Sequence, residues 1–184
     1  MEKLRLRLCY TPRSGERIFL HGDMTDAELW GFLSKVAGGR RNTSNDPGKI
    51  VDFILGRKRR VLDGGIVATK GGFELVPGTM CEIRSWADWK ALKEGRGAQS
   101  PDMGYQPDPF VDTSGPQARL VAHYYAQDQN ELLVDYGELR LAIEELESDL
   151  IAFCDRLDEW LTSFNLPNKT RLIRKLGQWF HFPV

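Results

Sequence analysis

The chain has 184 residues, 41% of them hydrophobic and 28% charged, and a formal net charge of −1 at pH 7. This length suits one domain with its own core, and the composition argues against a disordered chain. The three cysteines are far apart and no apolar run could span a bilayer, so we expect no disulfide framework, no membrane contact, no cofactor and a cytoplasmic location.

The first part of the chain alternates strand and helix signals. Leucine alternates with arginine over 4–8, which predicts a strand with one apolar face, and a second short strand is expected at 17–20. Thr25 and Glu28 have the spacing of a capping box, so a helix should begin there and end at the next pair of glycines. Asp46 followed by proline predicts a second, shorter helix.

The middle of the chain carries turn signals between short apolar runs. Asp-Gly and Gly-Gly pairs divide the stretch 59–76 into three runs, which predicts a three-stranded meander. Ser85 and the two tryptophans that follow it predict a helix over 86–92. The stretch 94–118 is rich in glycine and proline and is expected to be a loop, followed by a hairpin over 118–135.

The last third of the chain has a helical pattern. Apolar residues recur at intervals of three and four over 137–164, which predicts a long amphipathic helix, and a basic helix is expected at 172–180. The apolar stripe of the long helix is broad, which suits packing on a sheet better than a free coiled coil. We therefore expect a single α+β domain over 1–184, with a mostly antiparallel sheet packed against a long C-terminal amphipathic helix.

Acidic residues are concentrated in this long helix. Residues 131–161 contain ten acidic side chains and two basic ones. Much of this charge lies off the apolar stripe and faces solvent or a partner, and a cationic partner would relieve the repulsion between like charges. The residues expected to bind a basic protein are Glu144, Glu145, Asp149, Asp155, Asp158 and Glu159. The alternative is an ordinary solvated face.

A second candidate site surrounds Cys81. A catalytic thiol needs a lowered pKa and a nearby base, which His123 or His21 could supply if the fold brought one close. This hypothesis places a pocket under the 94–118 loop, lined by Cys81, His123, Asp102 and Asp108. The alternative is that Cys81 belongs to the core, because free cysteine is among the most buried residue types.

Two further patterns favour no site. His21 and Asp23 follow a strand, as in some metal sites, but the chain has three histidines and none is spaced i, i+4 with another, so we expect no metal. Basic clusters at 40–41, at 57–60 and in the last helix could contact phosphates. The slight net acidity favours a solvated rim instead, so nucleic-acid binding is not expected; salt-sensitive retention on heparin would indicate it.

Several motifs follow one another between residues 60 and 162. They are Gly64-Gly65, Pro77-Gly78-Thr79-Met80-Cys81, Trp86 with Trp89, Pro107-Asp108-Pro109, and the acidic helix ending at Trp160-Leu161. This pattern resembles a family of uncharacterised bacterial proteins that have a Gly-Gly hairpin, a Pro-Gly-Cys turn, a Trp-x-x-Trp helix and an Asp-Pro loop. Members of that family have more cysteine at the turn and a histidine in the loop, and their absence here argues against shared metal or thiol chemistry.

The resemblance implies no established activity, but it implies a small bacterial protein of the kind that acts as an immunity or accessory factor in toxin systems. We therefore expect a non-enzymatic protein-binding module, such as an immunity protein or an inhibitor of a basic toxin like a nuclease, that acts through the acidic helix. The alternative is a small enzyme or ligand-binding domain with its pocket around Cys81, His123 and the 94–118 loop.

Overall fold

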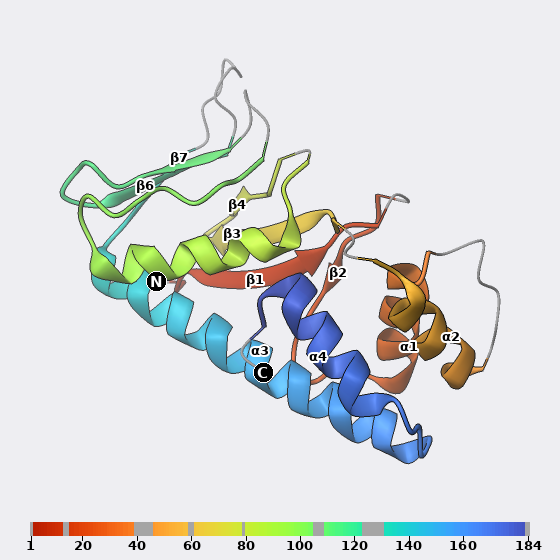
Figure 1. Cartoon of the computed structure of the whole chain (residues 1–184). Helices are drawn as coiled ribbons and strands as arrows, with labels where there is room; N and C mark the ends of the chain where they lie inside the picture. The colour runs from red at the N-terminus through yellow and green to blue at the C-terminus, as the bar shows by residue number, and fades with distance from the viewer. Residues whose placement is uncertain are drawn as a thin grey trace.

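The computed structural model describes residues 2–12, 15–38, 46–58, 61–78, 80–104, 109–122 and 131–182. The chain forms a single α+β domain with two antiparallel sheets and a long helix near its C-terminal end, so the expected fold class is confirmed. The smaller sheet lies at one end of the molecule, the first two helices lie at the other, and the long helix runs along one side (Figure 1).

The larger sheet has the strand order β2-β1-β3-β4. Its strands are β1 (Arg5–Tyr10), β2 (Ile18–Phe19), β3 (Gly64–Lys70) and β4 (Phe73–Leu75). Alternation decides which side of β1 faces the core: Leu6 and Leu8 are buried, whereas Arg5 and Arg7 are exposed. The two strands expected in the first 20 residues are therefore confirmed.

The meander predicted over 59–76 is wrong in its first strand. Residues 61–62 do not form a strand, and the neighbour of β3 at that edge is β1. The sequence pair Gly64-Gly65 was interpreted as part of a turn, but both glycines lie inside β3, opposite Tyr10 and Cys9. A Cβ atom on Gly64 would lie 2.2 Å from the Cys9 carbonyl oxygen. Glycine is needed there because two backbones come into close contact.

The hairpin expected over 118–135 belongs to a separate sheet. This sheet has the order β5-β6-β7, formed by Phe110–Asp112, Ala118–Val121 and Glu131–Val134. Two expectations therefore need correction: the strands form two sheets, and the predicted loop 94–118 contains β5. The run in β5 is three residues long and lies among loop-forming residues, so its partner strand decides its conformation.

The helix expected after Ser85 is a 3₁₀ helix, η2, over Ile83–Glu94. It starts earlier than predicted, and Ser85 lies inside it rather than at its cap. The buried residues Ile83, Trp86, Trp89 and Leu92 recur every three positions. This spacing matches the three residues per turn of a 3₁₀ helix, so one apolar row faces the core along the whole element. The indole Nε1 of Trp86 donates to the Phe180 carbonyl at 2.7 Å.

The first two helices begin at the predicted caps. Helix α1 (Asp26–Val36) has a complete capping box between Thr25 and Glu28, and α2 (Pro47–Gly56) begins after Asp46, whose side chain accepts from the Gly48 amide. The C-terminal end of α2 is held from another element: the Lys175 ammonium donates to the Leu55 carbonyl at 2.8 Å and also to the Arg57 carbonyl. A cation at this end also complements the helix dipole.

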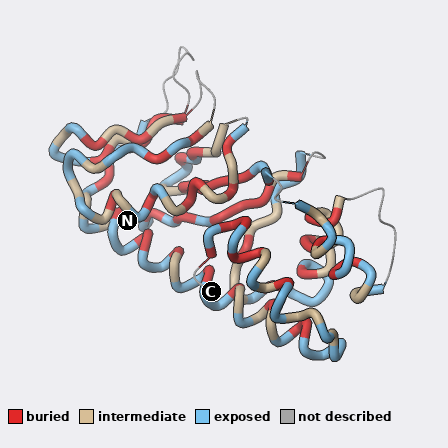
Figure 2. Tube along the Cα trace, viewed as in Figure 1, coloured by how far each residue is buried: buried red, intermediate tan, exposed pale blue. Residues whose placement is uncertain are grey.

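The long helix α3 (Tyr136–Ser163) and the last helix α4 (Lys169–Phe180) complete the core. Buried residues repeat along one side of α3, which appears as red bands in Figure 2. Phe153 of α3 packs its ring edge-on against Phe32 of α1, with ring centroids 5.6 Å apart. Across the described ranges, no helix has the length and apolar character that crossing a membrane requires.

Candidate functional site

The outer side of α3 carries the acidic face, which we define as Glu144, Glu145, Asp149, Asp155, Asp158 and Glu159. The helix begins at Asp135, whose carboxylate accepts from the Gly137 amide at 2.7 Å. In the first turn, the Tyr136 hydroxyl donates to the Thr113 carbonyl at 2.8 Å, so the start of the helix is fixed to the loop after β5. Its apolar stripe turns inward, and this leaves the carboxylates on the outside.

Four members of the acidic face are exposed and have no ion pair with any side chain that the structure describes. They are Glu144, Asp149, Asp155 and Glu159. Asp155 and Glu159 are four residues apart, so they are neighbours on the helix surface and repel each other. A cation placed between them would gain attraction and would also remove this repulsion.

The other two members are paired with lysines from other elements. The Lys3 ammonium lies 2.8 Å from one carboxylate oxygen of Glu145, and the Lys169 ammonium lies 2.9 Å from Asp158. The pair between Lys3 and Glu145 is more than half exposed on both sides, and such surface pairs contribute little to stability. A partner can therefore take the place of Lys3 at small loss.

Two less exposed carboxylates of α3, Glu138 and Glu147, lie beside the acidic face and bind lysines of other elements. Glu138 accepts from the Lys70 ammonium at 2.6 Å and from the Leu4 amide at 2.8 Å. Burial opposes ionisation here, but these two hydrogen bonds prevail and hold the pKa of Glu138 below its ordinary value. Glu147 faces η2, where it pairs with Lys90 at 3.5 Å and with Lys93.

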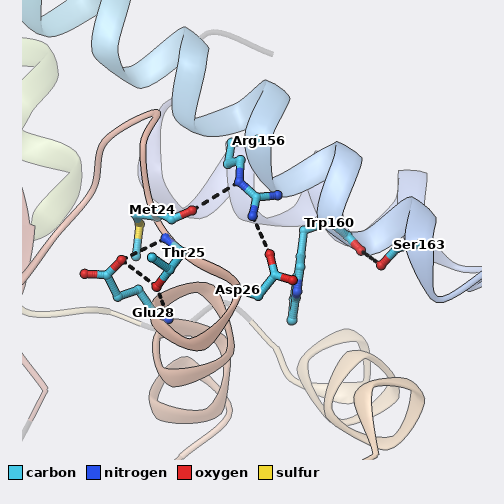
Figure 3. Close-up of polar contacts among 7 residues, drawn as sticks. All are labelled: Met24, Thr25, Asp26, Glu28, Arg156, Trp160 and Ser163. Atoms are coloured by element: carbon cyan, nitrogen blue, oxygen red, sulfur yellow. Dashed lines mark hydrogen bonds and ion pairs between the residues drawn. The ribbon is translucent and has the colours of Figure 1, made fainter.

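The side chain of Arg156 on α3 points toward the start of α1 (Figure 3). Its Nε donates to the Met24 carbonyl at 3.1 Å and its guanidinium pairs with Asp26 at the start of α1. The same region contains the Thr25 and Glu28 capping box. Arg156 therefore connects α3 to α1. It forms no ion pair with the four exposed carboxylates of the acidic face.

Exposed apolar side chains lie on the same outer side. Leu141 is 62% exposed and Ile151 is 48% exposed. By helical spacing, residues 141, 144, 148, 151, 155 and 159 follow one another along this side. The outer side of α3 therefore presents apolar and acidic groups together, which suits a partner with both kinds of complementary group.

The alternative site at Cys81 is buried. The thiol is 2% exposed, its Sγ lies 3.3 Å from the Ser85 hydroxyl, and it donates to the Asp102 carbonyl at 3.6 Å. Burial is the main cause that raises the pKa of Cys81 to about 11. A thiol in this state is a poor nucleophile at neutral pH. His123 and Asp108 lie outside the described residues, so the structure does not place them relative to Cys81.

The remaining candidates also stay apart. In the described part of the chain, no three His, Cys, Asp or Glu side chains form a group that could hold a metal ion. Of the basic clusters, 40–41 and 59–60 lie outside the described residues. Three basic side chains are exposed: Lys58, which follows α2, and Arg171 and Arg174 on α4. By contrast, Lys169 and Lys175 are engaged in internal contacts.

The fold and this surface define an α+β protein whose long helix has a charged outer side. No protein family, curated protein or solved structure matches the chain. The resemblance drawn from the motifs at 64–65 and 77–81 therefore stays a prediction.

Proposed function

We propose that the chain is a non-enzymatic protein-binding module that binds a basic protein through the acidic face of α3. The observation that supports this most directly is the set of four exposed carboxylates without an ion pair in the described structure: Glu144, Asp149, Asp155 and Glu159. Internal arginines could have neutralised this side of the helix, but Arg156 is committed to α1. Complementary charge gives a partner both speed of association and specificity.

The partner class that we favour is a basic toxin such as a nuclease, with this chain as its immunity protein or inhibitor. A nuclease binds phosphates with basic side chains, and a row of carboxylates on a rigid helix offers it a similar charge pattern. Leu141 and Ile151 would supply apolar contact within the same interface. The free thiols of Cys9, Cys81 and Cys154 support action in a reducing compartment, which we propose to be the cytoplasm.

Charge reversal tests this function. In a pull-down from a lysate of the source organism, the wild-type chain should retain a basic protein that Asp155→Lys with Glu159→Lys does not retain. Retention by wild type should weaken as salt rises, since exposed charges are screened.

The matched control is Asp88→Lys with Glu94→Lys on η2, which makes the same change in net charge at exposed positions outside α3. If both double variants retain the partner equally well, or both lose it equally, the acidic face is not the binding surface. Circular dichroism of each variant checks that the fold is unchanged.

A further inference from the structure

A groove separate from the acidic face lies between β2 and the exposed side of α1. Its volume is about 460 Å³, which falls in the range of small-molecule sites. The wall from the sheet contributes Arg7, Arg17 and Phe19, and the wall from the helix contributes Gly31, Phe32 and Lys35. Sequence reasoning did not identify this groove, because its residues come from three elements and form no motif.

The rim of the groove carries three basic side chains, Arg7, Arg17 and Lys35, and the carboxylate of Glu16. The guanidinium carbon of Arg7 lies 4.0 Å from the centre of the Phe19 ring, and no described carboxylate pairs with it. Arg17 pairs with Glu74 at 3.3 Å, and Lys35 pairs with Glu16. Glu74 and Glu16 are half exposed or more, so an anion in the groove could replace them at little loss.

Two further titratable side chains line the groove, Glu28 and His21. Glu28 is held by the amide and the hydroxyl of Thr25, each at 2.8 Å, which directs its carboxylate to the start of α1 (Figure 3). Phe19, Met24 and Phe32 also line the groove, and of these three side chains only Phe19 is appreciably exposed.

Gly31 gives an independent reason to expect a ligand. It lies in the middle of α1, where glycine destabilises a helix relative to alanine. A Cβ atom built on Gly31 meets nothing within 4 Å, so no packing contact in the protein requires glycine. A side chain at this position would instead fill the groove. Glycine here therefore leaves the groove open.

We propose that this groove binds a small anion in which a phosphate or carboxylate is joined to a planar apolar ring. The Arg7 guanidinium, held in place by Phe19, binds the anionic group with two donors, and Arg17 and Lys35 add charge. The ring lies over Gly31. Preorganisation of Arg7 reduces the entropy lost on binding. This inference does not depend on the proposed function of α3.

Binding of phenyl phosphate, benzoate, adenosine monophosphate and inorganic phosphate, followed by NMR titration of the full chain, tests the proposal. At least one ring-bearing anion should shift the amide signals of 17–19 and 27–35 at a lower concentration than inorganic phosphate does. Arg7→Gln should weaken that binding by about tenfold or more, as expected for the loss of a bidentate charged contact. Arg171→Gln on α4 is the control and should bind like wild type.

Gly31→Leu separates loss of binding from loss of folding. It should raise the Tm by about 2 to 4 °C, because leucine favours the helix, and should abolish binding by filling the groove. The proposal is overturned if no ring-bearing anion shifts these signals, if inorganic phosphate alone does so, or if Gly31→Leu and Arg7→Gln bind as wild type does.

Discussion

The two sides of α3 are built under different constraints. On the inner side, Phe153 has no exposed area and contacts rings from two other parts of the chain, Phe32 at 5.6 Å and Phe182 at 5.5 Å between centroids. On the outer side, Ile151 and the carboxylates of Asp155 and Glu159 face away from the core. The inner side determines whether the chain folds, whereas the outer side can change with little loss of stability and is therefore available for binding.

The largest expected effect is on the inner side. Phe153→Ala should destabilise the protein by about 3 to 5 kcal/mol, because it removes a fully buried ring and leaves a cavity. Ile151→Ala is the control on the outer side and should change stability by less than about 0.5 kcal/mol. Urea denaturation followed by circular dichroism measures both. Similar losses in the two variants would remove the distinction between the sides.

Cys154 tests the boundary between the two sides. It is half-buried, and burial is the main cause that raises the pKa of its thiol from 9.0 to about 11. Below pH 9 its thiolate fraction should be about a hundredfold lower than that of an ordinary thiol, and alkylation should be slower by a similar factor. The rate should rise about tenfold per pH unit up to the pKa, as measured by mass spectrometry after iodoacetamide treatment. Labelling as fast as that of a free peptide thiol would place Cys154 on the exposed side.

Glu138 joins α3 to the larger sheet, and its contribution to the stability of the protein should depend on pH. Glu138→Gln should cost about 1 to 2 kcal/mol at neutral pH, since it removes the charge that accepts from Lys70 and Leu4. The pKa of Glu138 is lowered from 4.5, so its contribution is present above that pH and is lost as the pH falls through the lower pKa of the folded state. The stabilities of wild type and variant should therefore converge in acid. A constant difference between pH 7 and pH 2 would contradict this.

The smallest expected change in stability comes from the outer side of α3. Asp155→Asn should stabilise the protein slightly, by about 0.2 to 0.5 kcal/mol at low salt, because it relieves the repulsion from Glu159. The gain should vanish at high salt, where the charges are screened. Thermal unfolding at two salt concentrations measures it. A clear loss of stability would mean that Asp155 has a structural partner within the protein.

Local signals in the sequence were sufficient for much of the fold. The capping box at Thr25 and the proline after Asp46 place the starts of α1 and α2, and the apolar stripe gives α3 within about one residue of its bounds. These features depend on neighbouring residues along the chain. The positions of the acidic side chains on the outside of α3 follow from the same periodicity.

Features that depend on residues far apart in the sequence could not be predicted in this way. The glycine pair in β3 has the sequence of a turn, and its role follows from the close backbone of β1 more than fifty residues earlier. The spacing after Ser85 predicts a helix but not its 3₁₀ form, because a three-residue apolar repeat can suit either form over a short length. The pairings of Glu145 with Lys3 and of Arg156 with Asp26 also required the three-dimensional fold.

The bond from the Trp86 indole to the Phe180 carbonyl has a consequence for synthesis in the cell. These groups are 94 residues apart in sequence, and both are buried. During translation the tryptophan leaves the ribosome before Phe180, the acceptor of this bond, has been added to the chain. The core around η2 therefore closes late, and until then the nascent chain exposes two tryptophans that a chaperone could recognise.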